Sequence, residues 1–171
     1  MVFMKKISEM SEREARVALA NDILYYFQRG LFVSRCSVYI HPTTLAEEQY
    51  SQMLACDLMD APVGGPLCDV CAKGAAWVAH YLMEQRETNG LSDIRRLALN
   101  LDYRRNSVNA IVGRHEMQMM EMLLENDAVF YNTFPDRQER VVLLWDYVRR
   151  HGEFDAPGFL NETLGEGWQH G

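Results

Sequence analysis

LCDVCAKGAAWVAHYL, residues 67–82, is the stretch that decides the fold. Small and aromatic residues follow two cysteines at helical spacing and predict a helix from Cys68 to about Glu87, where Asn89-Gly90 would end it. The small side chains are those that let a neighbouring backbone approach closely. They are Ala72, Gly74, Ala75, Ala76 and Ala79. We therefore predict that this helix lies at the centre of the fold.

The segment before the central helix predicts a helix and then an extended piece. Ser11 and Glu14 form a capping box, and Gly30 is placed to end the helix 11–29 in a left-handed turn. Residues 31–40 are rich in β-branched and aromatic side chains, which predicts a short extended segment or one arm of a small hairpin without an evident partner strand. A second capping box, at 44–47, predicts a helix to about residue 58.

Two longer helices are predicted after the central one, over residues 113–126 and 135–151. Each has an apolar stripe, and the second opens on Pro135 and ends before Gly152. The stripes consist of Met117, Met120, Leu123 and Leu124 in the first helix and of Val141, Leu144, Trp145 and Val148 in the second. A short helix at 93–99 is also predicted, and residues 102–112 are ambiguous.

These patterns predict a mainly α fold, a compact single domain of five or six helices with a short extended segment or small hairpin near 31–40. A length of 171 residues suits one domain, which we place at residues 1–154. Residues 155–171 contain four glycines and one proline. We expect them to form a flexible tail unless Phe159, Leu160, Leu164 or Trp168 docks onto the domain.

The composition is that of an ordinary globular protein, with 48% hydrophobic residues and a net charge of -7. This charge disfavours nucleic acid and anionic membranes and favours a basic partner surface. The first ten residues lack the apolar core of a secretory signal, and no apolar run is long enough to span a membrane. A cytoplasmic location is therefore expected, with the four cysteines as reduced thiols.

Cys68 and Cys71 have the spacing of metal-ligating cysteines, and a helix start would favour thiolates. A zinc site would need two further ligands, available from Cys36, Cys56, His41, His80 and His115. A redox pair would lack the usual βαβ context. The favoured interpretation is that both thiols are small buried hydrophobic groups. We therefore expect no cofactor, with zinc at Cys68 and Cys71 as the alternative.

Partner contacts are the second kind of site that the sequence suggests. Arginines concentrate between residues 95 and 114 and could meet phosphates or a partner's acids, although a solvated face is the default interpretation. Two methionines fall off the apolar stripe of 113–126 and could touch another chain. The residues we nominate for partner binding are Arg95, Arg96, Arg104, Arg105, Met119 and Met122.

No sequence motif nominates a catalytic residue. Glu121 and Glu125 lie four apart on one predicted helix and could do acid–base chemistry, but carboxylates at this spacing are more typical of a solvated face. The chain contains no nucleophile elbow, phosphate-binding loop, dinucleotide fingerprint, zinc-protease motif or EF-hand loop.

Several segments together resemble small uncharacterised proteins of phage and bacterial genomes. The segments are Ala18–Leu24, Leu31–Tyr39, the block Cys68-Asp69-Val70-Cys71-Ala72-Lys73-Gly74-Ala75, Met120-Glu121 with Leu124-Glu125, and Arg149–Phe154. Members of this group have a Cys-x-x-Cys-Ala-x-Gly-Ala helix and an Ile-Glu-x-x-Phe-Glu helix, where this chain has Met120 and Leu124 in place of isoleucine and phenylalanine. The resemblance implies a viral or mobile-element setting and no particular chemistry.

The sequence favours a non-enzymatic protein-interaction protein of phage or mobile-element origin that binds and inhibits a host protein, for instance one of a defence system. One alternative is a metal- or thiol-dependent enzyme or small-ligand binder centred on Cys68 and Cys71. A second is a nucleic-acid accessory protein that uses the region from Arg95 to Arg114. We expect no membrane partner, and self-association is left open.

Overall fold

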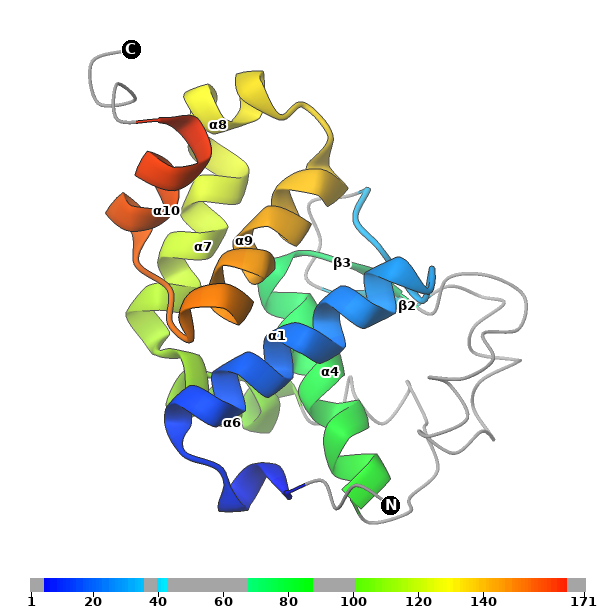
Figure 1. Ribbon diagram of the computed structural model, residues 1–171. Coiled ribbons are helices and arrows are strands. Elements are labelled where there is room, and N and C mark those ends of the chain that lie inside the picture. The colour runs from blue at the N-terminus through cyan, green and yellow to red at the C-terminus, as the bar shows by residue number, and fades with distance from the viewer. Residues whose placement is uncertain (1–4, 36–39, 43–67, 88–100, 166–171) are drawn as a thin grey trace.

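A computed structural model describes residues 5–35, 40–42, 68–87 and 101–165 of the chain (Figure 1). The fold is mainly α, as predicted. Its helices are the short 3-10 helix η1 (Ile7–Glu9), α1 (Glu12–Gln28), α4 (Ala72–Glu87), α6 (Leu101–Val112), α7 (Arg114–Asn126), α8 (Ala128–Thr133), α9 (Arg137–His151) and α10 (Ala156–Leu164). Three short strands complete the described part: β1 (Phe32–Val33), β2 (Ile40–Pro42) and β3 (Cys68–Val70). The helices predicted at 44–58 and 93–99 lie outside the described residues.

Helix α4 is the central helix, as the small residues predicted. Every residue from Val70 to Met83 except Lys73 is buried. α4 contacts α1, α6, α7 and α9, which surround it in Figure 1. The indole N–H of Trp145 on α9 donates to the carbonyl of Ala72 at 3.1 Å, so a specific hydrogen bond also joins α9 to the first turn of α4.

The prediction that this helix begins at Cys68 is wrong, because residues 68–70 form strand β3. β3 is the middle strand of a three-stranded sheet, parallel to β1 and antiparallel to β2. The extended segment expected near 31–40 is confirmed at Phe32–Val33. β1 and β2 do not form a hairpin with each other, since both pair with β3. Three residues are too few to show an alternating pattern, and their partners are distant in the sequence.

The ends of α1 follow the predicted signals. The Ser11 hydroxyl accepts a hydrogen bond from the backbone N–H of Glu14 at 3.1 Å, which is half of the predicted capping box. Glu14 directs its carboxylate to the Ser11 hydroxyl and to the Lys5 ammonium group. At the other end, Gly30 adopts a φ of +76°, a left-handed conformation that glycine enters at little cost.

Arg16 of α1 ties together the carboxyl-terminal ends of two other helices. Its guanidinium donates to the carbonyl of Gly152 at 2.6 Å and to that of Ile111 at 3.1 Å. Carbonyls at these ends lack partners within the helix, and a cation there also interacts favourably with the helix dipole. Gly152 has a φ of +72°, as its predicted role at the end of α9 requires.

The apolar stripes predicted for α7 and α9 are confirmed. All eight stripe residues are buried in one hydrophobic core. Pro135 was predicted as the first residue of α9, but the helix begins at Arg137, after Asp136 caps it by accepting from the N–H of Gln138 at 3.1 Å. The ambiguous residues 102–112 belong to α6. Helix α8 was not predicted; it begins where Asp127 accepts from the N–H of Phe130 at 2.7 Å.

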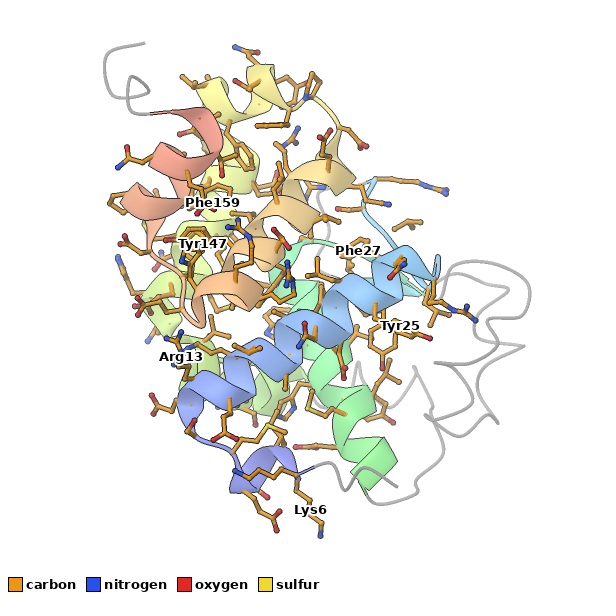
Figure 2. All side chains as sticks on the ribbon, viewed as in Figure 1. Lys6, Arg13, Tyr25, Phe27, Tyr147 and Phe159 are labelled. Carbon is orange, nitrogen blue, oxygen red and sulfur yellow. The ribbon has the colours of Figure 1, made fainter. Side chains whose placement is uncertain are left out.

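The expectation of a flexible tail from residue 155 is wrong for residues 156–164, which form α10. Phe159 and Leu160 are buried and belong to the hydrophobic core. Figure 2 shows Phe159 beside Tyr147 of α9, and their ring centroids lie 5.7 Å apart. Docking of these two apolar side chains, the exception foreseen for the tail, offsets the entropy cost of ordering the segment. Trp168 lies outside the described residues.

Candidate functional site

Cys71, the first candidate for chemistry, precedes α4 and is 1% exposed. Its sulfur accepts from the N–H of Gly74 at 3.4 Å, and a carboxylate oxygen of Glu121 on α7 accepts from the N–H of Lys73 at 2.8 Å. Burial raises the pKa of the Cys71 thiol strongly, and the nearby Glu121 charge raises it further. These two effects outweigh the backbone hydrogen bonds from Gly74 and Lys73, which lower the pKa, so the protonated thiol is favoured at neutral pH over the nucleophilic thiolate.

The two carboxylates considered for acid–base chemistry both have structural partners. Glu121 caps the start of α4 through Lys73, as described above, and Glu125 pairs with Arg137 of α9. Burial by itself would lower the pKa of Arg137, but the hydrogen bond to Glu125 and the negative charges of Glu125 and Glu121 together outweigh burial, and the pKa is raised. This cluster therefore joins α4, α7 and α9 rather than presenting a free acid and base.

Of the side chains considered for zinc, the structure describes those of Cys71, His80 and His115. Cys36 and Cys56 lie outside the described residues; Cys68 and His41 are placed by their backbones in β3 and β2. His80 lies on α4 nine residues beyond Cys71, which is about 13 Å along a helix. Among the residues that the structure describes, no group of three or more His, Cys, Asp or Glu side chains could hold a metal ion. Zinc at Cys68 and Cys71 thus stays an untested prediction.

Burial of the Cys71 thiol should protect it from chemical labelling in the folded protein. At pH 8 iodoacetamide is expected to leave Cys71 unmodified in the folded protein and to alkylate it in denaturant, because only the thiolate reacts. Peptide mapping by mass spectrometry resolves this cysteine from the other three. Labelling of Cys71 at equal rates in the folded and unfolded protein would contradict the protonated, buried thiol.

Because the pKa of Cys71 is raised by folding, we expect the free energy of unfolding to depend on pH. The pKa of Cys71 is higher in the folded protein than in the unfolded chain, so the unfolded chain loses the proton first as the pH rises. The contribution to stability is present below about pH 8.5 and is lost as the pH rises above it. In urea titrations from pH 7 to pH 10, Cys71→Ala is expected to show a smaller decline in unfolding free energy than the parent chain.

Of the six residues nominated for partner binding, the structure describes the side chains of Met119 and Met122. Arg95 and Arg96 lie outside the described residues, and the backbones of Arg104 and Arg105 belong to α6. Met119 is partly buried and packs against the core. Met122 is 50% exposed and lies toward the carboxyl-terminal end of α7, whereas α6 adjoins the amino-terminal end of α7 (Figure 1).

Met122 lies within ten residues in sequence of two further exposed apolar residues, which belong to α8 and were not predicted. Val129 is 38% exposed and Tyr131 is 55% exposed. In the described part of the chain, these three are the exposed large hydrophobic residues. All of them lie within residues 122–131, and we call them the α7–α8 surface. The cap at Asp127 was the sequence signal that could have located α8 and hence these positions.

Buried side chains hold α8 in place beneath this surface. Phe130 is fully buried, with its ring 5.3 Å from that of Phe159. The buried Arg140 of α9 donates to the carbonyls of Phe134 and Pro135 at 2.8 and 2.9 Å, and its guanidinium lies 4.8 Å from the ring centroid of Tyr131. Tyr131 is therefore an exposed aromatic side chain on a helix that buried side chains hold in position.

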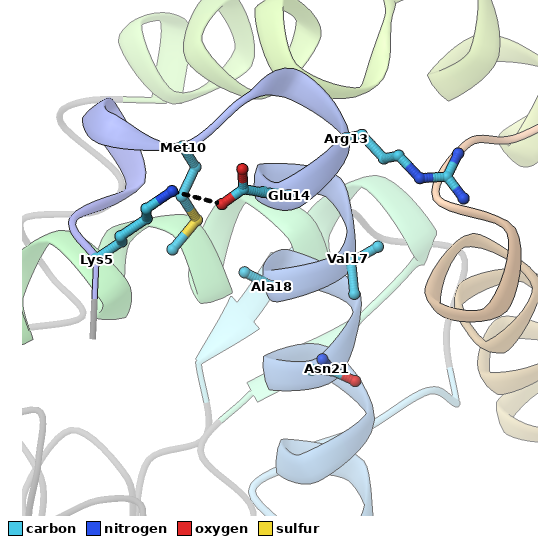
Figure 3. A pocket seen from close by; sticks show the side chains of 7 residues that line it. All are labelled: Lys5, Met10, Arg13, Glu14, Val17, Ala18 and Asn21. Atoms are coloured by element: carbon cyan, nitrogen blue, oxygen red, sulfur yellow. Dashed lines mark hydrogen bonds and ion pairs between the residues drawn. The ribbon is translucent and has the colours of Figure 1, made fainter. Parts of the chain in front are cut away.

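A shallow hollow lies beside α1, with a volume of about 460 Å³ (Figure 3). Met10, Val17 and Ala18 supply apolar walls, and the ion pair between Lys5 and Glu14, at 3.1 Å, bounds one side. The two charges neutralise each other, and the hollow is open to solvent. Nothing in its lining selects a particular ligand.

Within the described ranges, no helix combines the length and apolar character needed to cross a membrane. Comparison of the chain with protein-family models, with curated proteins and with solved structures finds no match.

Proposed function

We propose that this chain is a non-enzymatic protein-interaction protein of phage or mobile-element origin that binds and inhibits a host protein through the α7–α8 surface. The observation that carries the proposal is the exposure of Met122, Val129 and Tyr131 within ten residues of one another in sequence. Aromatic residues and methionine are enriched at protein interfaces, and an anchored aromatic side chain loses little conformational entropy on binding. The phage setting is supported by the resemblance of the sequence segments alone.

The thiol-based alternative gains no support from the surroundings of Cys71. A catalytic thiol needs thiolate character and access to a substrate, whereas Cys71 is buried and its pKa is raised. Of the arginines that would carry the nucleic-acid alternative, from Arg95 to Arg114, the structure describes the side chain of Arg114, which is exposed. The exposed apolar residues therefore favour the interaction proposal.

Site-specific photo-cross-linking tests the proposal directly. A benzophenone amino acid is placed at Tyr131 or at Met122, and each variant is expressed in a bacterial host and irradiated. We expect a covalent adduct of one defined mass from both positions, because a single partner would cover both side chains. Mass spectrometry then identifies the partner and the peptide attached to each position.

The matched control carries the same photoreactive residue at Gln28, which is exposed at the end of α1. This position is expected to give no adduct of that mass. Adducts of the same identity and yield from positions 28, 122 and 131 would indicate random collisions. That result, or no adduct from 122 and 131 in several hosts, would count against binding through the α7–α8 surface.

A further inference from the structure

We infer that the partner meets the α7–α8 surface with a basic protein surface, in which lysine or arginine side chains surround an apolar group. This inference rests on the proposed function and adds the chemical class of the partner. The observation behind it is the charge on the elements that surround Met122, Val129 and Tyr131.

Residues 121–140 carry a large share of the negative charge of the chain. Five carboxylates stand against two arginines in this segment, a net charge of -3 out of -7 for the whole chain. The carboxylates are Glu121, Glu125, Asp127, Asp136 and Glu139, and the arginines are Arg137 and Arg140. The excess therefore lies in the same sequence segment as the exposed apolar residues.

Neither arginine is available to a partner's acidic groups. Arg137 is paired with Glu125, and Arg140 is buried, with its donors directed to backbone carbonyls and its guanidinium near the Tyr131 ring. Asp136 and Glu139, in contrast, are exposed. The positive charges in this segment are thus internal, while much of the negative charge faces the solvent.

The helices that carry these charges contact one another, α7 with α8 and α8 with α9. The carboxyl-terminal end of α7, helix α8 and the amino-terminal end of α9 meet at one end of the molecule, the top of Figure 1. Basic residues of α9 lie at the opposite end of that helix, namely Arg149, Arg150 and His151. An apolar contact flanked by carboxylates favours a basic protein surface and repels nucleic acid and anionic lipid.

Two synthetic helical peptides of equal length test the inference. Both have the same leucine face, and one carries lysine where the other carries glutamate. Titration into the ¹⁵N-labelled chain is expected to show that the lysine peptide shifts the amide signals of Met122, Val129 and Tyr131. The glutamate peptide is expected to leave them unchanged, and 0.5 M NaCl is expected to weaken binding of the lysine peptide several-fold, since exposed charges are screened.

Two charge reversals, one on α9 and one just beyond it, provide the matched comparison. Glu139→Lys changes the charge in the first turn of α9, the helix that contacts α8, and Glu153→Lys changes the net charge equally just beyond the opposite end of α9. Both residues are exposed, so both variants should fold. Glu139→Lys is expected to weaken binding of the lysine peptide roughly threefold or more, and Glu153→Lys to leave it nearly unchanged.

Three results would overturn the inference. They are equal binding of the two peptides, binding of neither at millimolar concentration, and shifts located away from residues 122–140. A dimer of the chain that Glu139→Lys dissociates would also overturn it, by making a second copy the occupant. The cross-linking experiment decides the proposed function separately, because it needs no assumption about the partner's charge.

Discussion

Trp145→Ala is expected to lower the free energy of unfolding by about 3–5 kcal/mol, because it removes a fully buried indole from the core. Trp145 is among the largest side chains that are completely buried. Its loss would leave a cavity between α9 and α4 and would also remove the hydrogen bond from its N–H to the Ala72 carbonyl. Urea unfolding followed by circular dichroism measures the change.

Trp145→Phe separates the two contributions to that loss. Phenylalanine keeps an aromatic ring in the core but lacks the indole N–H. The Ala72 carbonyl can still accept the regular bond within α4, so only its second hydrogen bond is lost. We expect a smaller loss, about 1–3 kcal/mol. Equal effects of the alanine and phenylalanine variants would show that the hydrogen bond, rather than packing, accounts for the contribution of Trp145.

Phe159→Ala is expected to cost about 3 kcal/mol and to release α10 from the body of the protein. Phe159 is 1% exposed, and its ring packs against Phe130, Tyr147 and Phe154 at centroid distances of 5.3, 5.7 and 5.7 Å. Hydrogen exchange should therefore speed up throughout residues 156–164. The unfolding free energy from urea titration gives the magnitude.

Phe159→Leu is the conservative control for α10. Leucine retains an apolar side chain in the same site, and we expect a loss below about 1.5 kcal/mol with the helix still protected from exchange. A truly flexible tail would respond differently, since neither substitution would change stability there. If Phe159→Ala left the free energy of unfolding unchanged, that result would support the flexible tail that the sequence predicted.

The sequence predicted those elements whose signals are local and repeated. Ser11 and Gly30 mark the two ends of α1, and the apolar stripes of α7 and α9 continue over several turns. A stripe that must be buried leaves a helix few alternatives, so these predictions agree with the structure. β3 and α10 were mispredicted because they are short, and each is stabilised by residues far away in the chain: β3 by β1 and β2, and α10 by the core.

The candidate surface was predictable only in part. Met122 falls off the apolar stripe of α7, and its exposure follows from that position. Tyr131 gave no such signal, because one turn of helix has no reliable periodicity. Its exposure depends on Phe130 pointing into the core and on Arg140 lying beside its ring. Both facts require the packing of α8 against α9 and α10.

The stretch 67–82 shows the same division between sequence and tertiary structure. The sequence by itself determined that a crowded central helix follows Cys71, because small side chains at helical spacing suit close packing on all sides. Only the tertiary structure decided that Cys68–Val70 is a strand and that Cys71 is a protonated, buried thiol. Strand pairing and the charge of Glu121 come from segments distant in sequence, and a pKa depends on those neighbours rather than on residue spacing.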